Sequence, residues 1–398
     1  MHRSDSETLE GFVDLVGARV WSERLAALHN LGAQTRGGRA LLSRHCIELA
    51  IERRRRRPNS PATPTEMRIT ALAAEAVYLA DTLPAAGRMR LRAALLAVFA
   101  SQDALVPLFY VLRTGCVQRS RGFEVEYVGL TEGERFDLLL YRNGVEAEVA
   151  CSVISAEEGR GVHRGAWFDL MDRIDPELQT WLAAHPGRYL LKVTLPQGLR
   201  GDTEPARGAL AALHSRITGL LSQARRADHD EAAVLRLDPL LLAGAQADEL
   251  GLAQSLRLEF GPEAHLAVIA AGGGVFALAA RAGRTDEIAT AVRHRLGAIA
   301  PVRLTGTRPG ILSIFIEEVE RREWRLLRER LELEGEARQF LTHPVARRRV
   351  VAVTCSSRHE LFGIPEPDGA PDGELRFRNP AHPAAKLPAL APAVLSSV

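Results

Sequence analysis

Three carboxylates lie close together in a stretch of the chain that is typical of a β-hairpin. Asp137 stands near the start of a first strand, and Glu146 and Glu148 form a Glu-x-Glu pair on a second. Asn143-Gly144 between the two strands is the strongest short signal for a hairpin turn. Carboxylates on neighbouring strands can hold Mg²⁺, which binds a phosphate oxygen and helps to generate hydroxide. The stretch is therefore a candidate site for metal-dependent hydrolysis of a phosphodiester.

The expected pairing of the two strands weakens this candidate. If Asn143-Gly144 is a two-residue turn, Asp137 faces Ala150. Glu148 then faces Leu139, so it is displaced from Asp137 toward the turn. A three-residue loop or a bulge would shift this pairing. With the tight turn, the neighbour of the aspartate is an alanine, and the acidic site is impaired.

The run FDLLLYRNGVEAEVACSVISAEEGRGVH, residues 136–163, resembles the core of the PD-(D/E)xK nuclease superfamily. The family pattern is an Asp opening a strand, a turn, a second strand with E-x-K, and a helix. Asp137 matches the Asp of that pattern, whereas Ala150 replaces the acid and Ser152 replaces the lysine. The matching positions after the strand are Gly159, Arg160 and His163. The resemblance thus implies a restriction-endonuclease-like core with a degenerate active-site motif.

This resemblance leaves several functions open. The first is a nucleic-acid-binding protein that is catalytically impaired and needs no cofactor. The second is an active Mg²⁺-dependent nuclease, in which Asp137, Glu146 and Glu148 hold the metal. Its catalytic residues would be Asp137, Glu148 and Lys192, the lysine being relocated from a neighbouring strand to stabilise charge at phosphorus. The third is a non-catalytic scaffold for protein interaction. A hairpin unrelated to the family, with solvated carboxylates, is the remaining reading.

Two groups of basic residues are candidates for contacts with nucleic-acid phosphates. One is the run of five arginines Arg53, Arg54, Arg55, Arg56 and Arg57, which closes a helical pattern before Pro58. The other lies near an expected helix start and consists of Arg160, His163 and Arg164, where anions bind readily. The alternatives are a solvated helix end, where cations are favourable, and ordinary surface charge.

The elements that carry these residues indicate an α/β (α+β) protein with a mixed central sheet flanked by helices. Apolar residues recur at spacings of three and four up to about residue 120, and alternate or cluster in strands from about residue 123. Seven prolines follow Gly363. The expected organisation is an all-α N-terminal region at 1–120, an α/β core at 121–360 with a possible inserted or second α/β subdomain at about 230–345, and a flexible Pro-rich tail at 361–398.

Composition narrows the class of protein. The four cysteines lie far apart, without the spacing of a zinc site or a disulfide framework. No apolar run is long enough for a membrane span or a signal peptide, so we expect a cytoplasmic protein without membrane association. The net charge of +2 favours no partner by itself. The resemblance implies DNA or RNA as a partner, a protein partner is also possible, and the oligomeric state is left open.

Overall fold

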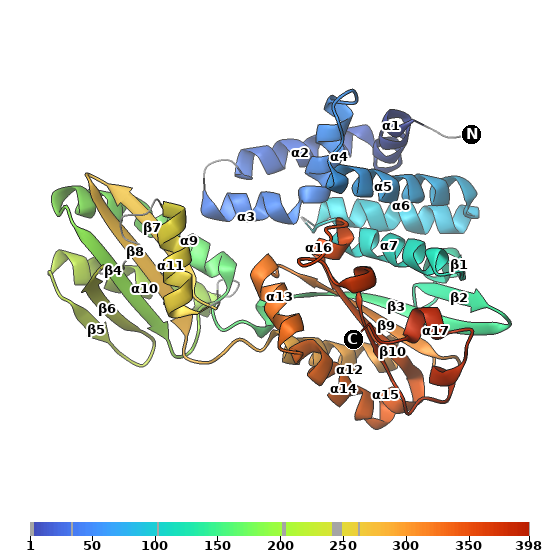
Figure 1. The fold of residues 1–398 in the computed structure, drawn as a ribbon. Coiled ribbons are helices and arrows are strands. Elements are labelled where there is room, and N and C mark those ends of the chain that lie inside the picture. Colours follow the sequence, from blue (N-terminus) through green and yellow to red (C-terminus); the bar gives the residue numbers. More distant parts are fainter. Residues whose placement is uncertain are drawn as a thin grey trace. The chain divides into compact units, whose positions relative to one another are not determined.

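The computed structural model describes residues 4–32, 35–101, 103–200, 204–240, 249–261 and 263–397 (Figure 1). The chain forms two compact units. The first unit contains Met1–Leu31, Leu42–Ala156 and Ala289–Val398, and the second contains Gly32–Leu41 and Glu157–Ile288. Most of the second unit is therefore a single insertion into the chain of the first.

Helices fill the chain before the first strand. They are α1 (Asp5–Val16), α2 (Ala18–Gly32), α3 (Arg36–Arg44), α4 (Cys46–Arg56), α5 (Pro64–Thr82), α6 (Ala85–Ala100) and α7 (Val106–Ser120). Capping boxes start α1 at Ser4 with Glu7 and α5 at Thr63 with Glu66, which satisfies backbone N–H groups at both helix starts. The apolar faces of α1, α2, α4, α5, α6 and α7 share one core around the fully buried ring of Phe12.

A six-stranded mixed sheet forms the centre of the first unit. Its strands, in order across the sheet, are β1 (Glu124–Glu126), β2 (Leu138–Arg142), β3 (Val145–Ser155), β9 (Gly310–Glu317), β10 (Val350–Ser357) and β11 (Leu375–Arg378). Strand β9 is parallel to both β3 and β10, and the other pairs are antiparallel. Helix α7 packs on one face, where the rings of Tyr110 and Phe315 lie 5.2 Å apart.

The remaining helices of the first unit follow the sheet strands. They are α8 (Val128–Thr131), α12 (Ile288–Arg303), α13 (Arg321–Glu329), α14 (Glu332–Thr342), α15 (Pro344–Arg349), α16 (Arg358–Leu361) and α17 (Ala391–Val394), with the short 3-10 helices η2 (Pro371–Gly373) and η3 (Pro383–Lys386). A further 3-10 helix, η1 (Ala156–Gly159), lies where the chain passes into the second unit. Figure 1 shows α12, α14 and α15 on the sheet face opposite α7. The sheet is thus a middle layer, which explains why β9 and β10 are almost wholly buried.

The second unit has its own five-stranded sheet. Across the sheet the strands are β5 (Ala227–His229), β6 (Val234–Pro239), β4 (Arg188–Leu195), β8 (Gly274–Ala282) and β7 (His265–Ala271). Helices α9 (Arg164–Ala184) and α10 (Glu204–Ser222) pack on one face around Trp167, Ile217 and Phe276. Helix α11 (Glu249–Phe260) packs on the other face through Leu256. Both faces of this sheet therefore carry apolar side chains.

The predicted mixed α/β class is confirmed. The structure differs from the expected organisation in the position of the inserted unit and in the C-terminal segment. The inserted α/β unit lies mainly at Glu157–Ile288 rather than at about 230–345. The flexible tail expected at 361–398 is not found in its described part, 361–397, because β11 pairs with β10 and Leu390 and Val394 are fully buried. Apolar residues of this segment pack onto the edge of the sheet, and the high proline content of the sequence does not reveal such tertiary contacts. In the described part of the chain, no helix is long and apolar enough to cross a membrane.

Candidate functional site

The hairpin of β2 and β3 closes with the tight turn that the sequence predicts. Asn143 and Gly144 have φ values of +50° and +76°, as a two-residue turn of this type requires. The strands pair Arg142 with Val145 at the turn and continue without a bulge. The backbone N–H of Asp137 donates to the Val149 carbonyl at 2.9 Å. Asp137 therefore lies beside Ala150, and the predicted pairing is confirmed.

The carboxylate of Asp137 bonds to backbone and to an arginine. Its Oδ2 accepts from the Cys151 N–H at 2.7 Å and from Nη2 of Arg303 at 2.7 Å. Burial raises the pKa of this carboxyl, and the Arg303 guanidinium and the Cys151 N–H act in the opposite direction. Arg303 also donates to the carbonyl of Arg135. This guanidinium thus ties the start of β2 to the end of α12.

The two glutamates of β3 bond to the segment that joins α12 to β9. Glu148 is fully buried and accepts from the Thr305 N–H at 2.8 Å and from the Thr305 hydroxyl. Glu146 is half exposed and accepts from Nε of Arg308. A second nitrogen of Arg308 lies 3.9 Å from Oε1 of Glu148. Residues 303–308, which we call the basic segment, therefore supply a partner to each of the three hairpin acids.

This arrangement does not resemble a metal-binding set. Mg²⁺ prefers several oxygen ligands that converge on one point. Among the described residues, no three His, Cys, Asp or Glu side chains are placed to hold a metal ion together. The acids point instead to three different donors, and Ala150 and Ser152 offer neither a carboxylate nor an ammonium. The Mg²⁺ site at Asp137, Glu146 and Glu148 stays a prediction, and these contacts weigh against it.

Lys192 belongs to a different sheet from Asp137. It lies on β4 of the second unit, where Nζ is 3.2 Å from Oδ2 of Asp238 and 5.6 Å from the ring centre of Phe260. Asp137 borders β2 in the sheet of the first unit. The two residues are therefore not neighbours on adjacent strands, which was the reason for considering this lysine.

The candidate phosphate contacts near α9 have structural partners. Arg160 is 3% exposed, and its guanidinium pairs with Glu157. The backbone N–H of Arg164 donates to Oε2 of Glu157 at 2.7 Å. His163 is the N-cap residue of α9, and its backbone N–H donates to the Leu199 carbonyl at 2.8 Å. Burial of the Arg160 side chain leaves little of it for a ligand.

Most of the arginine run at the end of α4 is paired with acids of the same unit. The ion pairs are Arg53 with Glu66, Arg54 with Asp5, Arg55 with Glu10 and Glu52, and Arg56 with Glu52. Arg57 follows the helix end and is exposed. These pairs hold α4 against α1 and α5, so the run is largely neutralised within the helical layer.

The sequence reasoning missed the basic segment. Arg303, Thr305 and Arg308 lie more than 150 positions from the acids that they contact. Their only local signal is the stretch LTGTRPG, whose Gly and Pro mark a turn before an apolar strand. Comparison with protein-family models, with curated proteins and with solved structures finds no match to this chain.

Proposed function

We propose that this chain is a nucleic-acid-binding protein with a nuclease-like core in which the acidic hairpin is structural and catalysis is impaired. One observation carries the proposal: each hairpin acid bonds to the basic segment, and Arg303 is the cation beside Asp137. The strand-turn-strand frame of the resemblance is retained, whereas the donors needed for metal chemistry are not.

The chemistry of phosphodiester hydrolysis makes this distinction sharp. In a metal-dependent nuclease, one or two carboxylates hold Mg²⁺ together with a substrate phosphate, and the rate depends on stabilisation of the charge that develops at phosphorus. Ala150 lies beside Asp137, and Lys192 belongs to the other sheet. The Arg303 guanidinium stands where a metal ion would be expected beside Asp137, and unlike a metal ion it cannot coordinate and activate a water molecule. The hairpin therefore holds two parts of the fold together and does not activate a nucleophile.

Charge around the hairpin supports binding of a polyanion. Arg303, Arg308, Arg347, Arg348 and Arg349 belong to the basic segment and to α15, and Arg349 donates to the Leu304 carbonyl at 2.8 Å. These five guanidinium groups carry more positive charges than the three hairpin carboxylates can neutralise. Such a local excess of arginine attracts nucleic-acid phosphates, and it does so less at high salt.

The test combines binding and cleavage with the full chain. Fluorescence anisotropy with labelled single- and double-stranded DNA and RNA, at several salt concentrations, measures binding. The same substrates are then incubated with Mg²⁺ or Mn²⁺, using the wild type and Asp137→Ala. We expect salt-dependent binding and no cleavage. Metal-dependent cleavage that Asp137→Ala abolishes would establish the active nuclease, and absence of affinity for every substrate would leave the interaction scaffold.

A further inference from the structure

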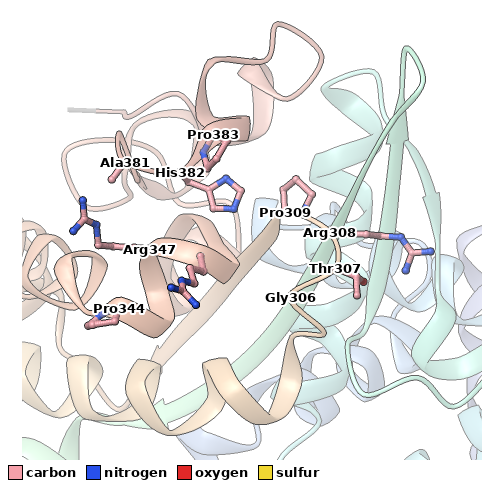
Figure 2. A pocket seen from close by; sticks show the side chains of 10 residues that line it. Gly306, Thr307, Arg308, Pro309, Pro344, Arg347, Ala381, His382 and Pro383 are labelled. Atoms are coloured by element: carbon pink, nitrogen blue, oxygen red, sulfur yellow. The ribbon is translucent and has the colours of Figure 1, made fainter.

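A cavity of about 600 Å³ opens in the first unit between three segments of the chain (Figure 2). The segments are the end of the basic segment with Pro309, helix α15, and the turn before η3. The lining residues are Gly306, Thr307, Arg308, Pro309, Pro344, Arg347, Arg348, Ala381, His382 and Pro383. The volume is within the range of pockets that bind ligands of nucleotide size.

The charge of this lining has one sign. Three arginines and a histidine line the cavity, and no carboxylate does. Arg308 is engaged with Glu146. Arg347 and Arg348 are exposed, and within the described chain neither has a carboxylate at ion-pair distance. Arg347 and Arg348 thus bring two guanidinium groups without a carboxylate partner to the lining of one cavity, and each guanidinium is a fork of N–H donors that suits a phosphate.

His382 contributes shape to the cavity and not charge. It is 8% exposed, and its Nδ1 accepts from the Ala384 N–H at 3.1 Å. Burial lowers the pKa of this imidazole, against a hydrogen bond with the Arg348 backbone that raises it. The neutral ring is thus fixed beside the backbone that carries Arg348. The positive charge of the cavity lining comes from its arginines.

The walls of the cavity are stiff and partly apolar. Pro309, Pro344 and Pro383 come one from each of the three segments, and Figure 2 shows them around the opening. Proline rings fix the local backbone and present apolar carbon surfaces. The Thr307 hydroxyl is 2.7 Å from the Thr305 hydroxyl, which itself bonds to Glu148. The cavity therefore offers a cationic part beside apolar surfaces that suit a sugar or a base.

We propose that this cavity binds one nucleotide, with its phosphate between Arg347 and Arg348 and its sugar or base against the proline rings. This inference rests on the proposed nucleic-acid binding and gives it a location. The phosphate ester has two possible sources, a free mononucleotide and a nucleotide within a strand. Arg347 and Arg348 replace Arg160 and the paired arginines of α4 as the expected phosphate contacts. Arg160 is buried and paired with Glu157, and Arg53 to Arg56 are paired with acids.

The experiment compares two double variants of the full chain. Arg347→Gln with Arg348→Gln removes both cavity charges. Arg88→Gln with Arg322→Gln is the matched control, since both residues are exposed and change the net charge equally. Anisotropy with a labelled single-stranded oligonucleotide gives affinity and salt dependence, and competition with inorganic phosphate, adenosine monophosphate and unlabelled strand identifies the source.

We expect the cavity variant to lose at least about tenfold in affinity, since each lost contact is a charged hydrogen bond. The slope of log affinity against log salt should fall by about 0.7, because one single-strand phosphate contact is removed. The control variant should lose less affinity than the cavity variant, and its salt slope should also fall by less. Arg347→Lys with Arg348→Lys should recover part of the affinity, since lysine keeps the charge but not the two-pronged geometry.

The outcomes separate the two proposals. Strand binding that the cavity variant retains in full would overturn the cavity and leave the nucleic-acid proposal in place. Binding of adenosine monophosphate without any strand binding would support the cavity and overturn nucleic-acid binding. If adenosine monophosphate competes at the same nucleotide concentration as the unlabelled strand does, the free nucleotide is the ligand. No binding of any probe would overturn both proposals.

Discussion

Replacement of Arg303 by methionine tests whether the basic segment holds the hairpin in place. Arg303 Nη2 bonds to Asp137 Oδ2 at 2.7 Å, and the side chains are 31% and 22% exposed. Breaking a fully buried ion pair costs about 3–5 kcal/mol, and an exposed pair contributes about 0.2–1 kcal/mol. For this partly buried pair we expect Arg303→Met to lower the free energy of unfolding by about 2 kcal/mol.

A double-mutant cycle separates the ion pair from the other contacts of Arg303. Asp137→Asn removes the charge and keeps an oxygen that can accept from the Cys151 N–H. In that background the loss caused by Arg303→Met should shrink by about 1 kcal/mol, because only the carbonyl contacts remain. Urea unfolding followed by circular dichroism measures the four proteins, with Arg322→Met as an exposed control. An equal cost of Arg303→Met in both backgrounds would refute the coupling.

Two further predictions concern Glu317, which is partly buried, and Glu148, which is fully buried, in the first unit. Burial, with the neighbouring Glu318, raises the pKa of Glu317 from 4.5 to about 7. The folded protein therefore binds more protons than the unfolded chain between these values, and the free energy of unfolding falls as pH rises through them, by about 3 kcal/mol in total. Glu317→Gln should raise the melting temperature at pH 8 relative to the wild type and leave it nearly unchanged at pH 4.5; an equal shift at both pH values would contradict this. Thr305→Val removes the hydroxyl that donates to fully buried Glu148 and should lower the free energy of unfolding by about 1–3 kcal/mol, whereas Thr307→Val is the neighbouring control and should cost less.

The hairpin could be predicted from sequence because its determinants are local. Asn143-Gly144 selects the tight turn, and the turn fixes which residues face each other. The pairing of Asp137 with Ala150 follows from counting outward from that turn. Strand patterns elsewhere gave the mixed α/β class by the same local logic. Both inferences need only contacts between residues near each other in the chain.

The partners of the acids could not be predicted in this way. Arg303 is 166 positions from Asp137, and nothing in the local pattern of either residue specifies the contact. Lys192 lies on a strand, as expected, but alternation along a strand does not say which sheet it joins. The segment after Gly363 was mistaken for a tail because prolines dominate its composition. Its strand β11 is only four residues long and gains its stability from pairing with β10.

The most direct test of the account is a calorimetric titration of the full-length protein with Mn²⁺ at neutral pH. Asp137→Asn serves as the comparison, since it removes the central carboxylate charge and keeps the side-chain shape. If Arg303 and Arg308 already neutralise the hairpin acids, the two proteins should give the same weak heats, without saturation at a defined stoichiometry. Saturable binding of one or two Mn²⁺ ions to the wild type that Asp137→Asn abolishes would contradict the account, and would restore the hairpin as a metal site.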